Sequence, residues 1–139
     1  MAPRLRTGAR AVFVVYALVI VTLTHWPGMQ IEGPVPRSDL WAHLGAFGLW
    51  GLLFGCAGWF GRPDTRRGFL AAWGVGIVYT AIDEATQAIP ALRRVAAWDD
   101  WAANLMGFTL GLIASAVLLR VLDRAGSRSA RPPADTDPA

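Results

Sequence analysis

The sequence contains several long segments without a charged residue. Three of them cover residues 11–31, 40–61 and 101–119. Each is close to the roughly 20 residues that a helix needs to cross about 30 Å of hydrocarbon. Only 17% of the chain is charged, whereas an average soluble domain has about a quarter charged residues. The pattern therefore predicts an integral membrane protein and excludes a disordered chain.

A further charge-free segment, residues 68–82, is too short to cross a membrane by itself, because as a helix it covers roughly 22 Å. To cross the bilayer, this helix must continue past Glu84 to about Ile89. Pro90 ends it there, because proline cannot continue the helical hydrogen-bond ladder. The sequence thus predicts an all-α, integral membrane four-helix bundle whose third helix carries carboxylates at the membrane boundary.

The arginines predict the orientation of this bundle. All 13 basic residues are arginines, and all but three lie in the two terminal segments or in the loop between the second and third helices. The three at the other end are Arg37, Arg93 and Arg94. By the positive-inside rule, both termini are cytoplasmic, and we expect the protein in a bacterial inner or plasma membrane. The basic charge is then explained by topology and by contact with membrane lipids, and nucleic-acid binding is not supported.

Three parts of the chain are expected. Residues 1–10 form a cytoplasmic leader, residues 11–122 the transmembrane domain, and residues 123–139 a disordered cytoplasmic tail. The alternative for the first helix is a cleaved signal peptide. It is disfavoured because residues 24–27 read THWP rather than a run of small residues, and because further spans follow. Cys56 is the only cysteine, which excludes a disulfide framework.

Polar residues interrupt the apolar pattern at the outer ends of the predicted helices. Asp39 and His43 begin the second helix, four residues apart and therefore on one face. Asp100 and Asn104 begin the fourth helix with the same spacing. Structural roles are the alternative for each: the aspartates as helix N-caps, and His43 and Asn104 as partners in hydrogen bonds between helices.

Glu84 is the hardest of these residues to explain structurally, because an unpaired carboxylate at the bilayer boundary costs on the order of 1–3 kcal/mol. Gln87 lies on the same turn, and Arg94 follows in the next loop. We expect Arg94 to fold back and pair with Glu84, which keeps the carboxylate ionised. Gly107 and Gly111 continue the face of the fourth helix inward, where small residues let a neighbouring helix approach closely.

Short connections make the four helices antiparallel neighbours, so the polar residues are expected to line one pocket that opens outward. The expected members are Asp39, His43, Glu84, Gln87, Arg94, Asp100 and Asn104. No metal site is predicted, since one histidine with scattered carboxylates is a weak zinc signal, although the oxygens would suit a hard cation such as Mg²⁺. The sequence indicates no particular cofactor.

In their order along the chain, these motifs resemble those of the VanZ-like proteins, small membrane proteins with four short helices. The matching features are Asp-x-x-x-His at Asp39 and His43, Glu-x-x-Gln at Glu84 and Gln87, Arg-x5-Asp-x-x-x-Asn at Arg94, Asp100 and Asn104, the glycines Gly107 and Gly111, and residues 24–27. The resemblance covers residues 11–119. Where the family often has Pro-Gly-Arg, residues 90–94 read PALRR, and the spacing to Asp100 favours Arg94 over Arg93 as the equivalent arginine. The resemblance implies a role in the cell envelope, of the kind that gives low-level resistance to the glycopeptide teicoplanin.

Three functions remain open from the sequence. The first is a non-catalytic membrane component that alters how envelope molecules or glycopeptides interact with the cell surface. The second is a membrane enzyme acting on a lipid-linked phosphate or similar intermediate. In that case Arg94 would hold the anion, and Glu84 or Asp39, together with His43, would move protons, while Gln87, Asp100 and Asn104 would bind the ligand. The third is a proton-linked transporter component, which is disfavoured because polar residues occupy only one half of the membrane.

Overall fold

The computed structural model describes residues 3–29 and 33–129, and over these residues it is all-helical, without strands. The helices are α1 (Pro3–Thr24), α2 (Ser38–Ala57), α3 (Arg66–Gln87), the short 3-10 helix η1 (Pro90–Leu92) and α4 (Trp98–Ser129). Three of the α-helices, α1, α2 and α4, are long and apolar enough to cross a membrane. The prediction of an all-α fold with four helices is confirmed.

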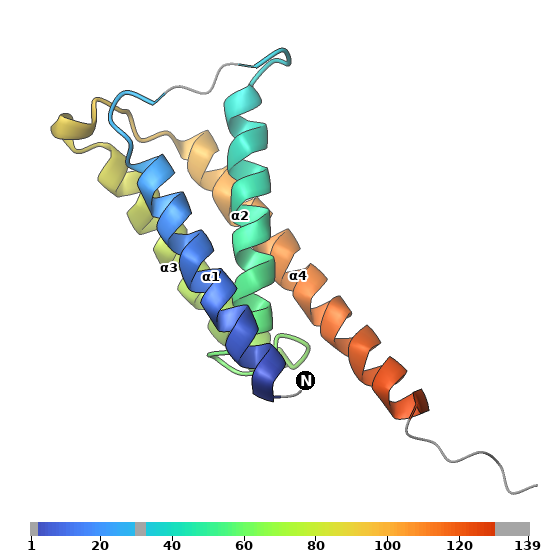
Figure 1. Cartoon of the computed structure of the whole chain (residues 1–139). Coiled ribbons are helices and arrows are strands. Elements are labelled where there is room, and N and C mark those ends of the chain that lie inside the picture. The colour runs from blue at the N-terminus through green and yellow to red at the C-terminus, as the bar shows by residue number, and fades with distance from the viewer. Residues whose placement is uncertain (1–2, 30–32, 130–139) are drawn as a thin grey trace, which may run out of the picture.

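The four α-helices run alternately up and down, so that the beginning of α1 and the end of α4 lie at the same end of the molecule (Figure 1). The opposite end contains the last turns of α1 and α3, the first turns of α2 and α4, and η1. Helix α4 crosses behind α2, and its C-terminal half extends away from the other helices (Figure 1). This arrangement brings together the polar residues that the sequence places at the outer helix ends.

Two helix boundaries differ from the expectation. Helix α1 begins at Pro3 and ends at Thr24, because Pro27 follows closely and Gly28 adopts a left-handed conformation with φ 68°. Helix α4 continues to Ser129, into the segment for which the sequence predicts a disordered tail. Arg128 in its last turn interacts favourably with the negative end of the helix dipole. The remainder of that predicted tail, 130–139, lies outside the described residues.

Helix α3 forms as the sequence predicts. Its first turn is capped by Thr65, whose side chain accepts a hydrogen bond from the backbone N–H of Gly68 at 3.2 Å. The helix continues through the carboxylates Asp83 and Glu84 and ends before Pro90. Its buried residues form a single stripe of small side chains that becomes polar near the C-terminal end of the helix: Gly68, Ala72, Gly76, Thr80, Asp83, Glu84 and Gln87.

Helices α2 and α4 form the closest helix pair, and glycines make this possible. A Cβ atom on Gly111 would collide with the carbonyl oxygen of Gly48, and one on Gly107 with that of Leu44. The prediction that these two glycines of α4 admit a neighbouring helix is confirmed. Next to this contact lies an aromatic core in which Trp50 packs against Phe108 with ring centroids 5.1 Å apart. The interior towards the N-terminal end of α1 is therefore apolar and well filled.

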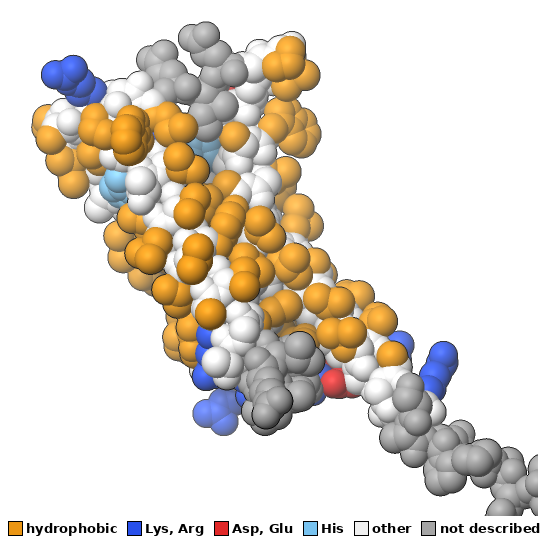
Figure 2. Space-filling model, in the orientation of Figure 1, with side chains coloured by type: hydrophobic (Ala, Val, Ile, Leu, Met, Phe, Trp, Pro, Cys, Tyr) orange, Lys and Arg blue, Asp and Glu red, His pale blue; other side chains and the backbone are white. Residues whose placement is uncertain are grey.

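The surface is unusually apolar. Valine and leucine side chains of α1 and α4 are about half exposed, and Figure 2 shows hydrophobic side chains along the length of the face it draws, with most of its arginines at the lower end. A soluble monomer rarely exposes an apolar surface this extensive.

Candidate functional site

Buried polar side chains gather at the end of the molecule where α3 stops and α4 begins. Each is at most 6% exposed, and together they come from three helices: His43, Thr80, Asp83, Glu84, Gln87 and Asn104. Burial of polar groups is costly unless they are hydrogen-bonded, so the partners of each side chain decide what this cluster can do.

His43 of α2 and Asn104 of α4 hold the two helices together at this level. The Nδ1 of His43 donates a hydrogen bond to Oδ1 of Asn104 at 2.9 Å. The other ring nitrogen, Nε2, lies 3.9 Å from Oδ2 of Asp100. The four-residue spacing of Asp100 and Asn104 therefore brings both side chains to one imidazole ring, as expected for one helix face. This geometry fixes the orientation of the ring and leaves Nε2 beside a carboxylate.

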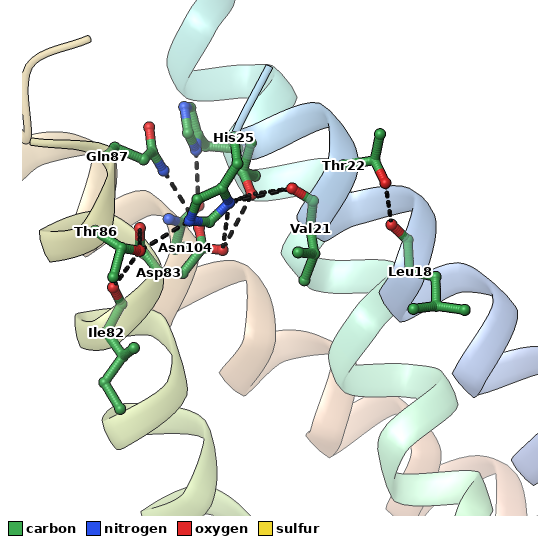
Figure 3. Close-up of polar contacts among 11 residues, drawn as sticks. Leu18, Val21, Thr22, His25, Ile82, Asp83, Thr86, Gln87 and Asn104 are labelled. Atoms are coloured by element: carbon green, nitrogen blue, oxygen red, sulfur yellow. Dashed lines mark hydrogen bonds and ion pairs between the residues drawn. The ribbon is translucent and has the colours of Figure 1, made fainter. Parts of the chain in front are cut away.

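Asp83 is the centre of a second group of contacts, which the sequence pattern did not predict. Thr24 of α1 donates to its Oδ1 at 3.0 Å, and Gln87 donates to its Oδ2 at 3.2 Å. His25 lies 3.9 Å from Oδ1 and reaches Thr86 on α3 with its Nε2, at 2.8 Å. Figure 3 shows His25 and Gln87 converging on Asp83. The signal for Asp83 was present in the sequence, since it continues the stripe of small residues on α3.

Glu84 does not pair with Arg94, so that expectation was wrong. Its Oε1 accepts a hydrogen bond from the backbone N–H of Ala97 at 2.8 Å, and its Oε2 has no partner among the described residues. The reason lies in the loop, where Arg93 adopts a left-handed conformation with φ 51° at the end of η1. The chain then brings the backbone of Ala97, rather than the side chain of Arg94, to the carboxylate.

The expected pocket is divided into two cavities. One, of about 340 Å³, lies between α3 and the start of α4 and is lined by Glu84, Trp98 and Trp101 together with alanines. The other, of about 150 Å³, lies between α1 and α2, where His43 and Arg94 contribute to its wall. The expectation of a single cavity was therefore wrong: the buried polar residues stand between two.

Asp39 lies at the rim of this region rather than inside it. Its side chain is 38% exposed and its Oδ2 lies 3.5 Å from Arg37, which also pairs with Asp99 of α4 at 2.5 Å. The hydrogen bonds that Arg37 donates to Asp99 and Asp39 raise the pKa of Arg37 above its ordinary value. The single arginine thus neutralises the two outer carboxylates and leaves the inner ones to other partners.

Several polar atoms of the cluster have no hydrogen-bond partner among the described protein groups. They are Glu84 Oε2, Gln87 Oε1, Asp100 Oδ1, Trp101 Nε1 and Asn104 Nδ2. Each such atom costs about 1–3 kcal/mol when it is buried without a partner, and native structures retain few of them without a functional reason. Three of these five atoms are acceptor oxygens and two are N–H donors, so the cluster can accept hydrogen bonds from a ligand and also donate to one.

The inner carboxylates are also not neutralised by arginine. Within the described chain, Asp83, Glu84 and Asp100 have no arginine within 4.0 Å; the nearest cationic candidates are His25 and His43, each 3.9 Å from an aspartate. No group of three or more histidine, cysteine, aspartate or glutamate side chains among these residues is arranged to hold a metal ion. The site is acidic, buried and incompletely hydrogen-bonded.

Comparison with known proteins gives no relative: no family model, no curated protein and no solved structure matches the chain.

Proposed function

We propose that the chain is an integral protein of a bacterial cytoplasmic membrane that crosses it four times, with both termini inside. Three apolar helices, the exposed apolar side chains around them and the arginines gathered at one end all support this placement. Helix α3 is less apolar, yet its 22 residues give about 33 Å of helix, enough to cross beside the others.

The topology is tested with single cysteines introduced into a Cys56→Ala background. A cysteine in the loop 62–67 should resist a membrane-impermeant thiol reagent in intact cells, because this loop lies inside. A cysteine near Pro34 should react. Reaction at 62–67 with protection near Pro34 would reverse the orientation and place the acidic cluster inside the cell.

Within this membrane placement, the protein acts in cell-envelope physiology by binding an envelope molecule at the acidic cluster, without a covalent step. The observation that carries this function is Glu84, a carboxylate 5% exposed that lines an open cavity and has one oxygen without a partner among the described residues. The resemblance of the sequence to the VanZ-like proteins supports the same role and names a phenotype, altered sensitivity to teicoplanin.

This function is tested by complementing a deletion strain and measuring its sensitivity to teicoplanin. Glu84→Gln keeps the shape of the side chain but removes its charge, so we expect it to lose the phenotype while the protein stays at normal abundance. The matched control is Asp99→Asn, which removes an exposed acid already paired with Arg37 and should complement fully. Full complementation by Glu84→Gln would show that the charge has no role.

One observation favours an enzyme as the second candidate. His43 and Arg94 line the same 150 Å³ cavity, and His43 is oriented by Asn104 with a carboxylate near its second nitrogen. An arginine with a planar donor fork suits a phosphate, and an oriented histidine suits proton transfer. In this case a lipid-linked phosphate would occupy that cavity, and His43→Asn would abolish turnover while retaining phosphate binding through Arg94.

A proton-linked transporter is not favoured by the packing below the cluster. Phe47, Trp50 and Phe108 fill the interior there and are at most 3% exposed. Beyond this layer, Ser115 is a buried polar side chain, and its hydroxyl is already occupied by the hydrogen bond that it donates to the backbone oxygen of Leu112.

A further inference from the structure

The 340 Å³ cavity between α3 and the start of α4 has one carboxylate in its wall, that of Glu84. Glu84 is fixed there by the N–H of Ala97, which occupies Oε1. Its other oxygen is buried without a protein partner in the described chain. Glu84 and Ala97 both line the cavity, so the carboxylate is held at the wall, with its second oxygen covered and unpaired among the described residues. A group with N–H donors would satisfy it.

The rest of the wall consists of two tryptophans and of small alanine side chains. Trp98 and Trp101 stand edge to face with ring centroids 5.9 Å apart and an angle of 83° between their planes, and alanines line the remainder. Tryptophan is the best of the aromatic side chains at attracting a cation to its face. The alanines leave room for an apolar substituent, and the volume exceeds what a small inorganic ion requires.

The charge around the cavity favours a cation over an anion. Asp83 and Asp100 contribute further carboxylate groups to the cluster, and no arginine among the described residues pairs with them or with Glu84. Arg94, the closest basic residue along the loop, contributes to the wall of the other cavity. A phosphate or carboxylate entering beside Glu84 would meet like charge without compensation.

We propose that this cavity binds the primary ammonium group of an amphiphile, with Glu84 accepting its hydrogen bonds and the two tryptophans facing its charge. A primary ammonium is favoured over a quaternary one because it has N–H donors for the free carboxylate oxygen. An aminophospholipid headgroup and a soluble amine with an apolar tail share this chemistry. The inference rests on the proposed membrane placement, which puts the cavity at the outer boundary where both are accessible.

The test uses the full chain in phosphatidylcholine nanodiscs, titrated with decylamine at neutral pH and followed by tryptophan fluorescence, with protein-free nanodiscs subtracted. Decylammonium should bind saturably and at least about 10-fold more tightly than decanol, because decanol has the tail without the charge. Decyltrimethylammonium should fall between them. Equal affinities for decylammonium and decanol would overturn the proposal.

Two variants assign the binding to this cavity. Glu84→Gln should weaken decylammonium binding by about 10-fold or more, whereas Asp99→Asn should leave it unchanged. Trp98 is 84% exposed, so Trp98→Leu preserves the fold; it should weaken binding by about 3- to 10-fold through loss of the aromatic face. Unchanged affinity in Trp98→Leu together with unchanged affinity in Glu84→Gln would overturn the proposal.

A final arm separates the two sources of the ammonium group. If an aminophospholipid is the natural occupant, phosphatidylethanolamine in the nanodisc will raise the apparent Kd for decylamine; if a soluble amine is, the Kd will not change. Binding in nanodiscs is independent of the envelope phenotype. Loss of that phenotype in Glu84→Gln without decylammonium binding would therefore reject the ligand class and retain the proposed function.

Discussion

The two ends of this helical bundle differ in how their acidic side chains are paired. At the end with most of the arginines, Arg62 donates to Asp64 at 2.9 and 2.8 Å and also pairs with Asp123 of α4. Arg120 adds a hydrogen bond to the backbone oxygen of Asp64 at 2.8 Å. The hydrogen bonds from Arg62 hold the pKa of Asp64 below its ordinary value. Acids here are neutralised by close basic partners.

At the other end, the acids are deeper and less well satisfied. Glu84 is 5% exposed and accepts one hydrogen bond from the part of the chain that the structure describes, whereas the Asp64 side chain is 14% exposed and accepts two from one arginine. The arginine-rich end shows that this bundle can give its acids close hydrogen-bond partners. Folding alone therefore does not explain why one oxygen of Glu84 is left without one. We infer that the first end stabilises the fold, while the second retains unsatisfied groups that a ligand can use.

Forcing apart the two helices that connect these ends should destabilise the protein most. In Gly111→Ala, the new Cβ would collide with the carbonyl oxygen of Gly48, so α2 and α4 must move apart at a cost of about 2–3 kcal/mol. Gly45→Ala is the matched control, because nothing lies within 4 Å of its Cβ. Thermal unfolding in detergent should show a lower Tm for the first variant only. Equal Tm values would mean that the close approach of α2 and α4 does not support the fold.

Glu84→Gln should change the stability in the opposite direction from removal of a paired acid at the arginine-rich end. Removal of a buried, incompletely satisfied carboxylate should stabilise the protein by about 1 kcal/mol, even though it abolishes the envelope phenotype. Chemical denaturation in mixed micelles measures the stability and complementation measures the phenotype. A variant that loses both would assign Glu84 to the scaffold and remove the distinction between the two ends.

A smaller effect of opposite sign is expected from Asp64→Asn. The folded-state pKa of Asp64 is lowered by Arg62, so this carboxylate stabilises the fold above its unfolded pKa of about 4, and the contribution disappears as the pH falls through the lower folded value. The variant should lose about 0.5–1 kcal/mol at pH 7, since the pair is partly exposed to solvent. The difference in Tm from the parent should shrink below about pH 4, with the phenotype intact. A difference independent of pH would exclude the ion pair as its cause.

Much of the fold could be predicted from the sequence because burial in a membrane requires long apolar helices. The segments 40–61 and 101–119 predicted α2 and the apolar part of α4, and Pro90 correctly predicted the end of α3. The start of α1 at Pro3 was not predicted, because a charged leader gives no periodic signal. Neither was the extension of α4 to Ser129, since the composition of that segment resembles a linker.

The site was predictable where helix geometry determines it and not where a loop does. The contact between His43 and Asn104 follows from the positions of both residues near the first turns of α2 and α4, which run in the same direction and begin at the same end of the bundle. The partner of Glu84 depends instead on the backbone of residues 93–97, where the left-handed conformation of Arg93 turns the chain. Residue spacing cannot predict that dihedral angle, so the expected pairing of Arg94 with Glu84 was wrong.

The touching backbones of α2 and α4 also determine how the molecule can move. Two helices in contact through glycine and carbonyl groups cannot slide past one another without a collision, so this pair behaves as a rigid frame. Helix α3 meets α4 differently, with the side chain of Phe108 lying over Gly76, and a side chain can change rotamer. We therefore expect α3 and the segment 90–97 to be the parts that move, on the microsecond scale, when the cavity beside Glu84 widens. A ligand would enter by displacing these parts while the frame stays fixed.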